Sequence, residues 1–197
     1  MPALRTLIDG VPIATVSSDG YNLLSVRVSG TRINEELATI EVSGGIYPEG
    51  GESTYLIWAA DIHLLPNQEV TVQYLEKAET SHPGKTIDEQ YPDEPSCEEE
   101  DFTPTPEMFT KLRTMPTFRD GFKLFLESSQ GAHARVDTTP EDHGFAFSVD
   151  WNSFRPQHAR MSLHSYTIQS MEDRTDSTYH VQEKMNCGDE VKFALFA

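Results

Sequence analysis

The sequence contains few cysteines, and they show no spacing typical of a metal or redox site. Cys97 and Cys187 are the only two among 197 residues. Two isolated cysteines cannot by themselves complete a zinc site, and in a reducing compartment they stay free. A disulfide between them is expected only if the protein is exported. A chain of this length can bury a sizeable core without such a crosslink.

The sequence also lacks long hydrophobic runs. No stretch approaches the roughly 18 apolar residues that a membrane-spanning helix needs. The N-terminal region reaches Asp9 and Gly10 without the long apolar core of a signal peptide. We therefore expect a cytoplasmic protein that does not associate with a membrane.

Basic residues are scarce. The chain has 15 Lys and Arg against 32 Asp and Glu, which gives a net charge of −17 and a pI near 4.6. Binding to nucleic acid needs clustered basic side chains that neutralise phosphates, so a nucleic-acid partner is not expected. The same charge favours attraction to a basic protein partner.

Motifs of catalysis are missing as well. The sequence has no Gly-x-Ser-x-Gly and no His-Glu-x-x-His. Gly84-Lys85-Thr86 matches only the end of a phosphate-binding loop, because Glu79 stands where that loop requires glycine. We therefore predict no catalytic residue and no cofactor.

Alternation of apolar and polar residues dominates what is present. Val26 and Val28 in the first part of the chain, and Phe147 and Val149 in the second, are separated by polar residues. This period of two is typical of antiparallel strands with one buried face. The chain is predicted to be mostly β, in sandwich-like sheets.

The two parts of the chain also resemble each other. Similar short segments recur in the same order at an offset of 121 to 124 residues, which indicates an internal duplication. The matched positions are Val26 with Val149, Ile40 with Met161, Tyr55 with Tyr179, Val70 with Val191, and Arg32 with Arg155. We predict two similar antiparallel β-sandwich-like halves, residues 1–78 and 118–197, joined by an acidic connector at 79–117.

The connector has a composition of its own. Eight of the fourteen residues from Asp88 to Asp101 are acidic and none is basic. Beyond them, Thr105 suits a helix cap and Pro106 suits the first helical position. One short helix is therefore predicted here, with Met108, Phe109 and Leu112 packing as an apolar stripe.

An acidic segment with aromatic residues at its margins can dock on a basic surface, because aromatics anchor a contact while carboxylates steer it. The predicted partner-binding residues are Asp88, Glu89, Tyr91, Asp93, Glu94, Glu98, Glu99, Glu100, Asp101 and Phe102. A solvated linker is the alternative interpretation.

Histidines are concentrated in the second half, which holds five of the seven. Those that come nearest to a metal-ligand set are His133, His143 and His164. None of them shows the His-x-His spacing that places two rings on one face of a strand, so no metal site is predicted. Trp58 and Trp151 could stack on a sugar ring, but their apolar context favours the core.

These observations lead to a hypothesis about function. The chain is interpreted as a non-enzymatic protein-binding protein, by analogy with small acidic inhibitor or immunity proteins that mask a basic surface of their partner. A metal-dependent or carbohydrate-active β-sandwich protein using the histidine-rich half is one alternative. A structural subunit that self-associates is another.

Overall fold

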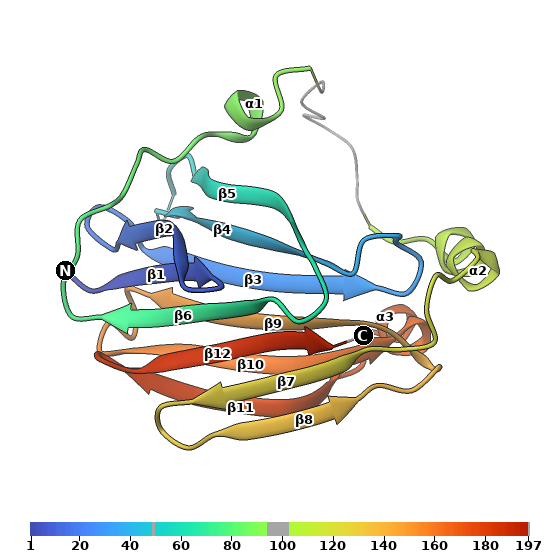
Figure 1. Ribbon diagram of the computed structural model, residues 1–197. Coiled ribbons are helices and arrows are strands. Elements are labelled where there is room, and N and C mark those ends of the chain that lie inside the picture. The colour runs from blue at the N-terminus through green and yellow to red at the C-terminus, as the bar shows by residue number, and fades with distance from the viewer. Residues whose placement is uncertain (49, 94–102, 197) are drawn as a thin grey trace.

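The computed structural model describes residues 1–48, 50–93 and 103–196. Two antiparallel six-stranded sheets, here called sheet A and sheet B, pack face to face (Figure 1). Within the described residues, no helix combines the length and the apolar character that crossing a membrane requires.

The first half of the chain forms six strands. These are β1 (Ala3–Ile8), β2 (Val11–Ser17), β3 (Leu23–Thr31), β4 (Ala38–Ile46), β5 (Thr54–Leu64) and β6 (Glu69–Leu75). The second half forms another six. These are β7 (Lys123–Ser128), β8 (His133–Asp137), β9 (Asp142–Asn152), β10 (His158–Thr167), β11 (Thr178–Asn186) and β12 (Glu190–Phe196). The helices are α1 (Ile87–Gln90), α2 (Pro106–Thr114) and α3 (Ile168–Glu172).

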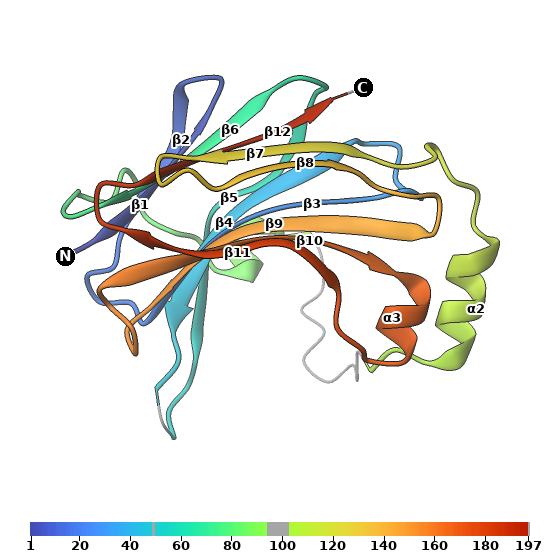
Figure 2. The ribbon, with the colours of Figure 1, turned by 90° about the horizontal axis from the view of Figure 1, so that it is seen from below.

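The strand order has an internal twofold pattern. Sheet A runs β2-β1-β6-β12-β7-β8 and sheet B runs β11-β10-β9-β3-β4-β5 (Figures 1 and 2). In each sheet, a strand of the first half and the strand numbered six higher lie equally far from the centre of the sheet. Examples are β1 with β7 in sheet A and β4 with β10 in sheet B. The predicted pairs, such as Ile40 with Met161 and Tyr55 with Tyr179, lie in equivalent strands.

The register shows where the twofold relation is centred. In sheet B, Val26 lies directly opposite Val149, the residue that the sequence repeat matches to it. In sheet A, Val70 lies opposite Phe193 and Val72 opposite Val191. The repeat matches Val70 to Val191 and therefore Val72 to Phe193. Each residue of one matched pair thus lies opposite a residue of the other pair, as a twofold axis between β6 and β12 requires. The two halves therefore meet strand to strand in both sheets.

The core lies between the sheets and takes residues from both halves. The Phe147 and Phe193 rings stack at a centroid distance of 4.8 Å, joining β9 of sheet B to β12 of sheet A. Trp58 and Trp151 are both buried, which confirms the prediction that they belong to the core. The Trp151 indole donates a hydrogen bond to the Pro156 carbonyl.

The helix predicted in the connector is α2. The Thr105 side chain accepts a hydrogen bond from the Met108 amide, and Pro106 occupies the first turn. Phe109 is buried, but Met108 is 51% exposed, so the predicted apolar stripe is only partly in the core. The short helices α1 and α3 were not predicted. Each depends on a capping box, Thr86 with Glu89 and Thr167 with Ser170, more than on an apolar face.

Candidate partner-binding surface

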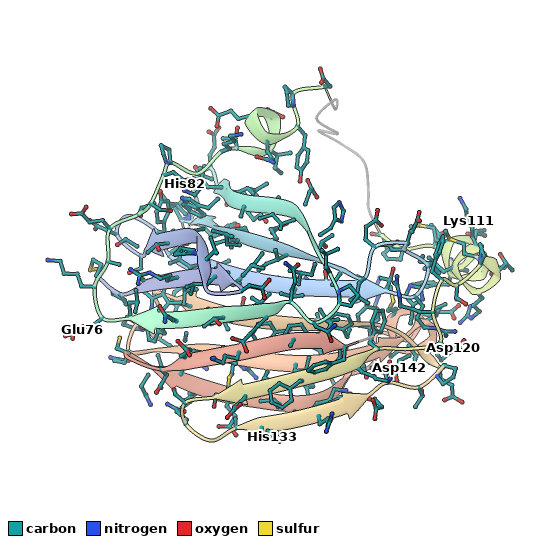
Figure 3. All side chains as sticks on the ribbon, in the orientation of Figure 1. Glu76, His82, Lys111, Asp120, His133 and Asp142 are labelled. Carbon is teal, nitrogen blue, oxygen red and sulfur yellow. The ribbon has the colours of Figure 1, made fainter. Side chains whose placement is uncertain are left out.

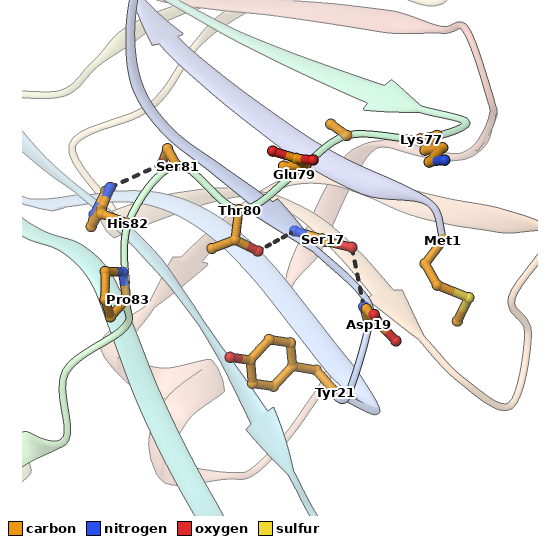
Figure 4. A pocket seen from close by; sticks show the side chains of 11 residues that line it. Met1, Ser17, Asp19, Tyr21, Lys77, Glu79, Thr80, Ser81, His82 and Pro83 are labelled. Atoms are coloured by element: carbon orange, nitrogen blue, oxygen red, sulfur yellow. Dashed lines mark hydrogen bonds between the residues drawn. The ribbon is translucent and has the colours of Figure 1, made fainter.

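The chain that follows β6 is attached to the edge strand β2. The Ser81 amide donates to the Thr15 carbonyl at 2.9 Å, and the Thr15 amide donates to the Ser81 hydroxyl at 3.1 Å. The Ser17 amide donates to the Thr80 hydroxyl at 3.1 Å (Figure 4). These bonds use donors and acceptors of an edge strand that would otherwise be unpaired. The first part of the connector is therefore a structural strap.

A shallow hollow of about 690 Å³ lies beneath this strap. Figure 4 shows Tyr21 and Asp19 on one side of it and Glu79 and Lys77 on the other. The Tyr21 ring packs edge-on against Trp58 at 5.2 Å, so the wall of the hollow continues into the core.

The strap then crosses to β5, the edge strand of sheet B. A ring nitrogen of His82 lies 2.8 Å from the Trp58 carbonyl oxygen, and Lys85 forms a two-bond bridge with Ile57. Gly84 passes over the Trp58 indole so closely that a Cβ there would lie 2.9 Å from the ring. One segment thus covers an edge of both sheets.

Helix α1 follows this crossing. The Thr86 hydroxyl accepts from the Glu89 amide at 3.3 Å, while the Glu89 carboxylate accepts from the Thr86 amide at 2.9 Å. The capping box satisfies backbone groups at the start of this single turn, and none of the residues of α1 is buried. Ile87 is 52% exposed and Asp88 is exposed beside it.

A bulge in β5 brings another carboxylate to this helix. Ala60 and Asp61 together oppose Glu41 at a register shift, and Asp61 has a left-handed backbone (φ 55°). Aspartate tolerates this conformation better than most residues. The Tyr91 hydroxyl donates to the Asp61 carboxylate at 2.7 Å. Sequence reasoning missed Asp61 and Ile87; the signal for Asp61 was a lone acid within an apolar strand.

We call this surface the acidic ledge and define it as Asp61, Ile87, Asp88, Glu89, Tyr91 and Asp93. Figure 1 shows α1 standing out beyond β5. Neither of the two ion pairs found in the described part of the chain involves a carboxylate of the ledge. Four of the predicted partner-binding residues, Asp88, Glu89, Tyr91 and Asp93, thus lie in α1 or just after it, and the structure adds Asp61 through its bond with Tyr91 and Ile87 through its exposure. The other predicted residues, Glu94, Glu98, Glu99, Glu100, Asp101 and Phe102, lie outside the described residues, as does Cys97.

The histidines considered as metal ligands lie in three different strands. His133 is exposed on β8, with its ring against Phe125 at 5.2 Å. Figure 3 shows His133 beside β8 and His82 above β5, on opposite sides of the molecule. His143 begins β9 and His164 lies on β10, both in sheet B. Among the residues that the structure describes, no group of three or more His, Cys, Asp or Glu could hold a metal ion.

His143 lines a pocket of about 430 Å³ between α2, α3 and the β8–β9 turn. Burial, and then the positive charge of Arg32, lowers the pKa of His143. The Arg32 guanidinium is itself held by the carbonyls of Arg119 and Pro140. The position of this arginine is thus fixed by the backbone around it.

A second histidine site lies where β10 and β11 pair. The His164 ring lies 5.2 Å from the Tyr179 ring, and its buried Nδ1 has no hydrogen-bond partner in the described part of the chain. Burial lowers the pKa of His164, and the charges of Arg27 and His180 add to this. His180 contacts the Ser165 hydroxyl at 3.1 Å, and burial lowers its pKa as well.

Comparison of the chain with protein-family models, with curated proteins and with solved structures finds no match.

Proposed function

We propose that the protein binds a basic protein partner through the acidic ledge and acts by masking a cationic surface of that partner. The observation that carries this proposal is the exposure of Ile87 beside Asp88 on a segment tied to the fold, where no carboxylate of the ledge forms an ion pair within the described residues. An exposed apolar side chain supplies a contact that excludes water, and the surrounding charges speed encounter.

The way in which the ledge is attached supports a binding role. The Ser81–Thr15 bonds, the Lys85–Ile57 bridge and the Tyr91–Asp61 bond hold the segment before and after α1. A surface that is already ordered loses less conformational entropy when it binds. The net charge of −17 adds a long-range attraction for a basic partner.

Copurification from the native host would identify the partner, and charge variants would then test the ledge. Asp88→Asn with Asp93→Asn removes two negative charges and leaves the Glu89 capping box intact. The matched control is Glu127→Gln with Asp137→Asn. These exposed residues lie on β7 and β8 of sheet A, whereas the ledge lies beside β5 of sheet B. Association should slow several-fold at low salt for the ledge variant and stay unchanged for the control.

The difference between the variants should shrink at high salt, because exposed charges are screened beyond about 8 Å at physiological ionic strength. Ile87→Ser should instead speed dissociation, since it removes an apolar contact. Equal association rates for the ledge and control variants at low salt would contradict the proposal.

A further inference from the structure

We propose that a second site, a pocket on the outer face of sheet B, binds the phosphoryl group of a small polar molecule. The pocket measures about 320 Å³ and is lined by the ends of β9, β10 and β11 and the β9–β10 turn. This volume lies at the lower end of the range for small-molecule sites, about 300–1,000 Å³. Its lining residues are Arg155, Arg160, Lys184, His158, Asn152, Gln182, Asp150 and Glu183.

Two of the basic residues are direct cross-strand neighbours. Arg160 on β10 lies opposite Lys184 on β11 in the strand register. Like charges placed directly opposite each other destabilise a sheet, and of these two residues only Arg160 also faces an acid, Asp150 on β9. Neither residue takes part in an ion pair within the described residues. An anion bound between them would replace this repulsion with two attractive contacts.

The fold itself does not require this pair of charges. In the first half, the equivalent of Arg160 is Thr39 on β4, and it lies opposite His63 on β5. The same place in the same sheet is therefore built with two residues that are not both cationic. The placement of Arg160 against Lys184 is a property of the second half and points to a ligand.

The third basic residue comes from a turn that is held firmly. The Pro156 carbonyl accepts hydrogen bonds from the Tyr74 hydroxyl at 2.9 Å and from the Trp151 indole at 3.2 Å. Both donors are buried, so the turn is anchored to the core. The Arg155 amide also donates to the Asn152 side chain at 3.1 Å. These hydrogen bonds therefore hold the backbone at Arg155 in place.

The guanidinium of Arg155 is available in a way that its counterpart is not. Arg32, its equivalent in the first half, donates hydrogen bonds to the carbonyls of Arg119 and Pro140. The Arg155 side chain forms no hydrogen bond or ion pair with the rest of the described chain. Its planar fork can then bind two oxygens of a phosphoryl group.

The acidic residues of the lining offset only part of this charge. Asp150 accepts hydrogen bonds from the Ser25 hydroxyl at 2.7 Å and the Ser148 hydroxyl at 2.8 Å, one on each carboxylate oxygen. Three basic residues against Asp150 and Glu183 leave the lining positive in a chain whose net charge is −17. A phosphate monoester, with a charge of about −1.5 to −2 at neutral pH, suits three cations better than a single carboxylate does.

The experiment measures binding of three probes by NMR amide shifts at matched ionic strength: inorganic phosphate, glucose 6-phosphate and glucose. We expect saturable shifts centred on residues 152–160 and 182–186 with inorganic phosphate. Glucose 6-phosphate should bind at least as tightly, because Asn152 and Gln182 can contact its hydroxyls, and glucose should not bind. Arg160→Gln and Arg155→Gln should each weaken binding about tenfold or more, as expected for the loss of a charged hydrogen bond.

Arg27→Gln is the matched control, since it removes one positive charge from β3 of the same sheet but lies outside the pocket lining. Its affinity for both phosphates should equal that of the wild type. Arg155 lies on an exposed turn, so Arg155→Gln should fold and still tests phosphate binding at the pocket if Arg160→Gln fails to fold. The site is disproved by an absence of saturable binding, or by equal losses in Arg155→Gln and Arg27→Gln. Binding of inorganic phosphate without glucose 6-phosphate would overturn the assignment of a monoester ligand.

Discussion

The two halves of the chain use one strand order but stabilise their equivalent turns by different means. In the first half, the β3–β4 loop is held by Arg119, whose guanidinium donates to the carbonyls of Thr31, Asn34, Glu35 and Glu36. In the second half, the β9–β10 turn is held by the buried Tyr74 and Trp151, which donate to Pro156. A repeated topology thus fixes where a turn lies, while the side chains that anchor the turn differ between the halves.

The largest expected effect concerns the core at the junction of the halves. Phe193 stacks on Phe147 at 4.8 Å, whereas its equivalent Val72 is a smaller residue that is equally buried. Phe193→Ala should lower the free energy of unfolding by about 3–5 kcal/mol, because it removes a ring and leaves a cavity. Val72→Ala should cost roughly 2 kcal/mol, from the loss of two buried methyl groups and a small cavity.

Urea unfolding monitored by circular dichroism measures both values, with exposed Val11→Ala as a control that should change stability little. If the two core variants lose the same free energy, the junction is less asymmetric than the structure indicates.

The next effect concerns the anchor of the first half. Arg119→Ala removes four hydrogen bonds to the β3–β4 loop. Because the group is partly exposed and water replaces some of these bonds, we expect a loss of about 2 kcal/mol. Hydrogen exchange of the amides of residues 32–37 should accelerate, while that of the β9–β10 turn should not. Equal acceleration at both turns would argue against separate anchors.

The anchor of the second half should give a smaller effect. Tyr74→Phe removes only the hydroxyl that donates to Pro156, and Trp151 continues to donate to the same carbonyl. The expected loss is about 1 kcal/mol, the net value of one hydrogen bond. Hydrogen exchange should now accelerate in the β9–β10 turn and leave residues 32–37 unchanged, the reverse of the pattern for Arg119→Ala.

Alternation and the constant offset were enough to predict the β class, the similarity of the halves and the equivalence of strands such as those of Ile40 and Met161. Those signals are local and repeat along the chain, so they survive without knowledge of the third dimension. The buried tryptophans and α2 were predictable for the same reason. The division of the chain at residues 78 and 117 remains a prediction.

The candidate surfaces were harder to predict because they depend on contacts between distant segments. Asp61 joins the acidic ledge through a bulge and through Tyr91, thirty residues away in the chain. The strap that ties Ser81 to Thr15 follows no sequence motif. Arg160 and Lys184 become neighbours only through the β10–β11 register. Composition indicated an acidic segment but could not indicate which strands this segment contacts.

The smallest expected effect is a pH dependence that arises in the second half. Burial holds the pKa of His143, His164 and His180 below the ordinary value, so the folded state favours their neutral forms. The unfolded chain binds these protons more readily, with an ordinary histidine pKa of about 6.5. The free energy of unfolding should therefore be at its full value above about pH 6.5 and should fall as the pH decreases below it.

His164→Gln removes one of these titrating groups and should make the fall in stability between pH 7 and pH 5, about the range of histidine titration, less steep. Urea unfolding at a series of pH values measures the slope, and an unchanged slope in the variant would show that His164 does not contribute. Because the three histidines lie on β9, β10 and β11, the amide protection factors, which correct for the slower intrinsic exchange at low pH, should fall first in the β10–β11 pair on acidification and later in the equivalent β4–β5 pair. A simultaneous fall of the protection factors in both pairs would mean that the two halves respond to acid as one cooperative unit, despite the uneven distribution of their histidines.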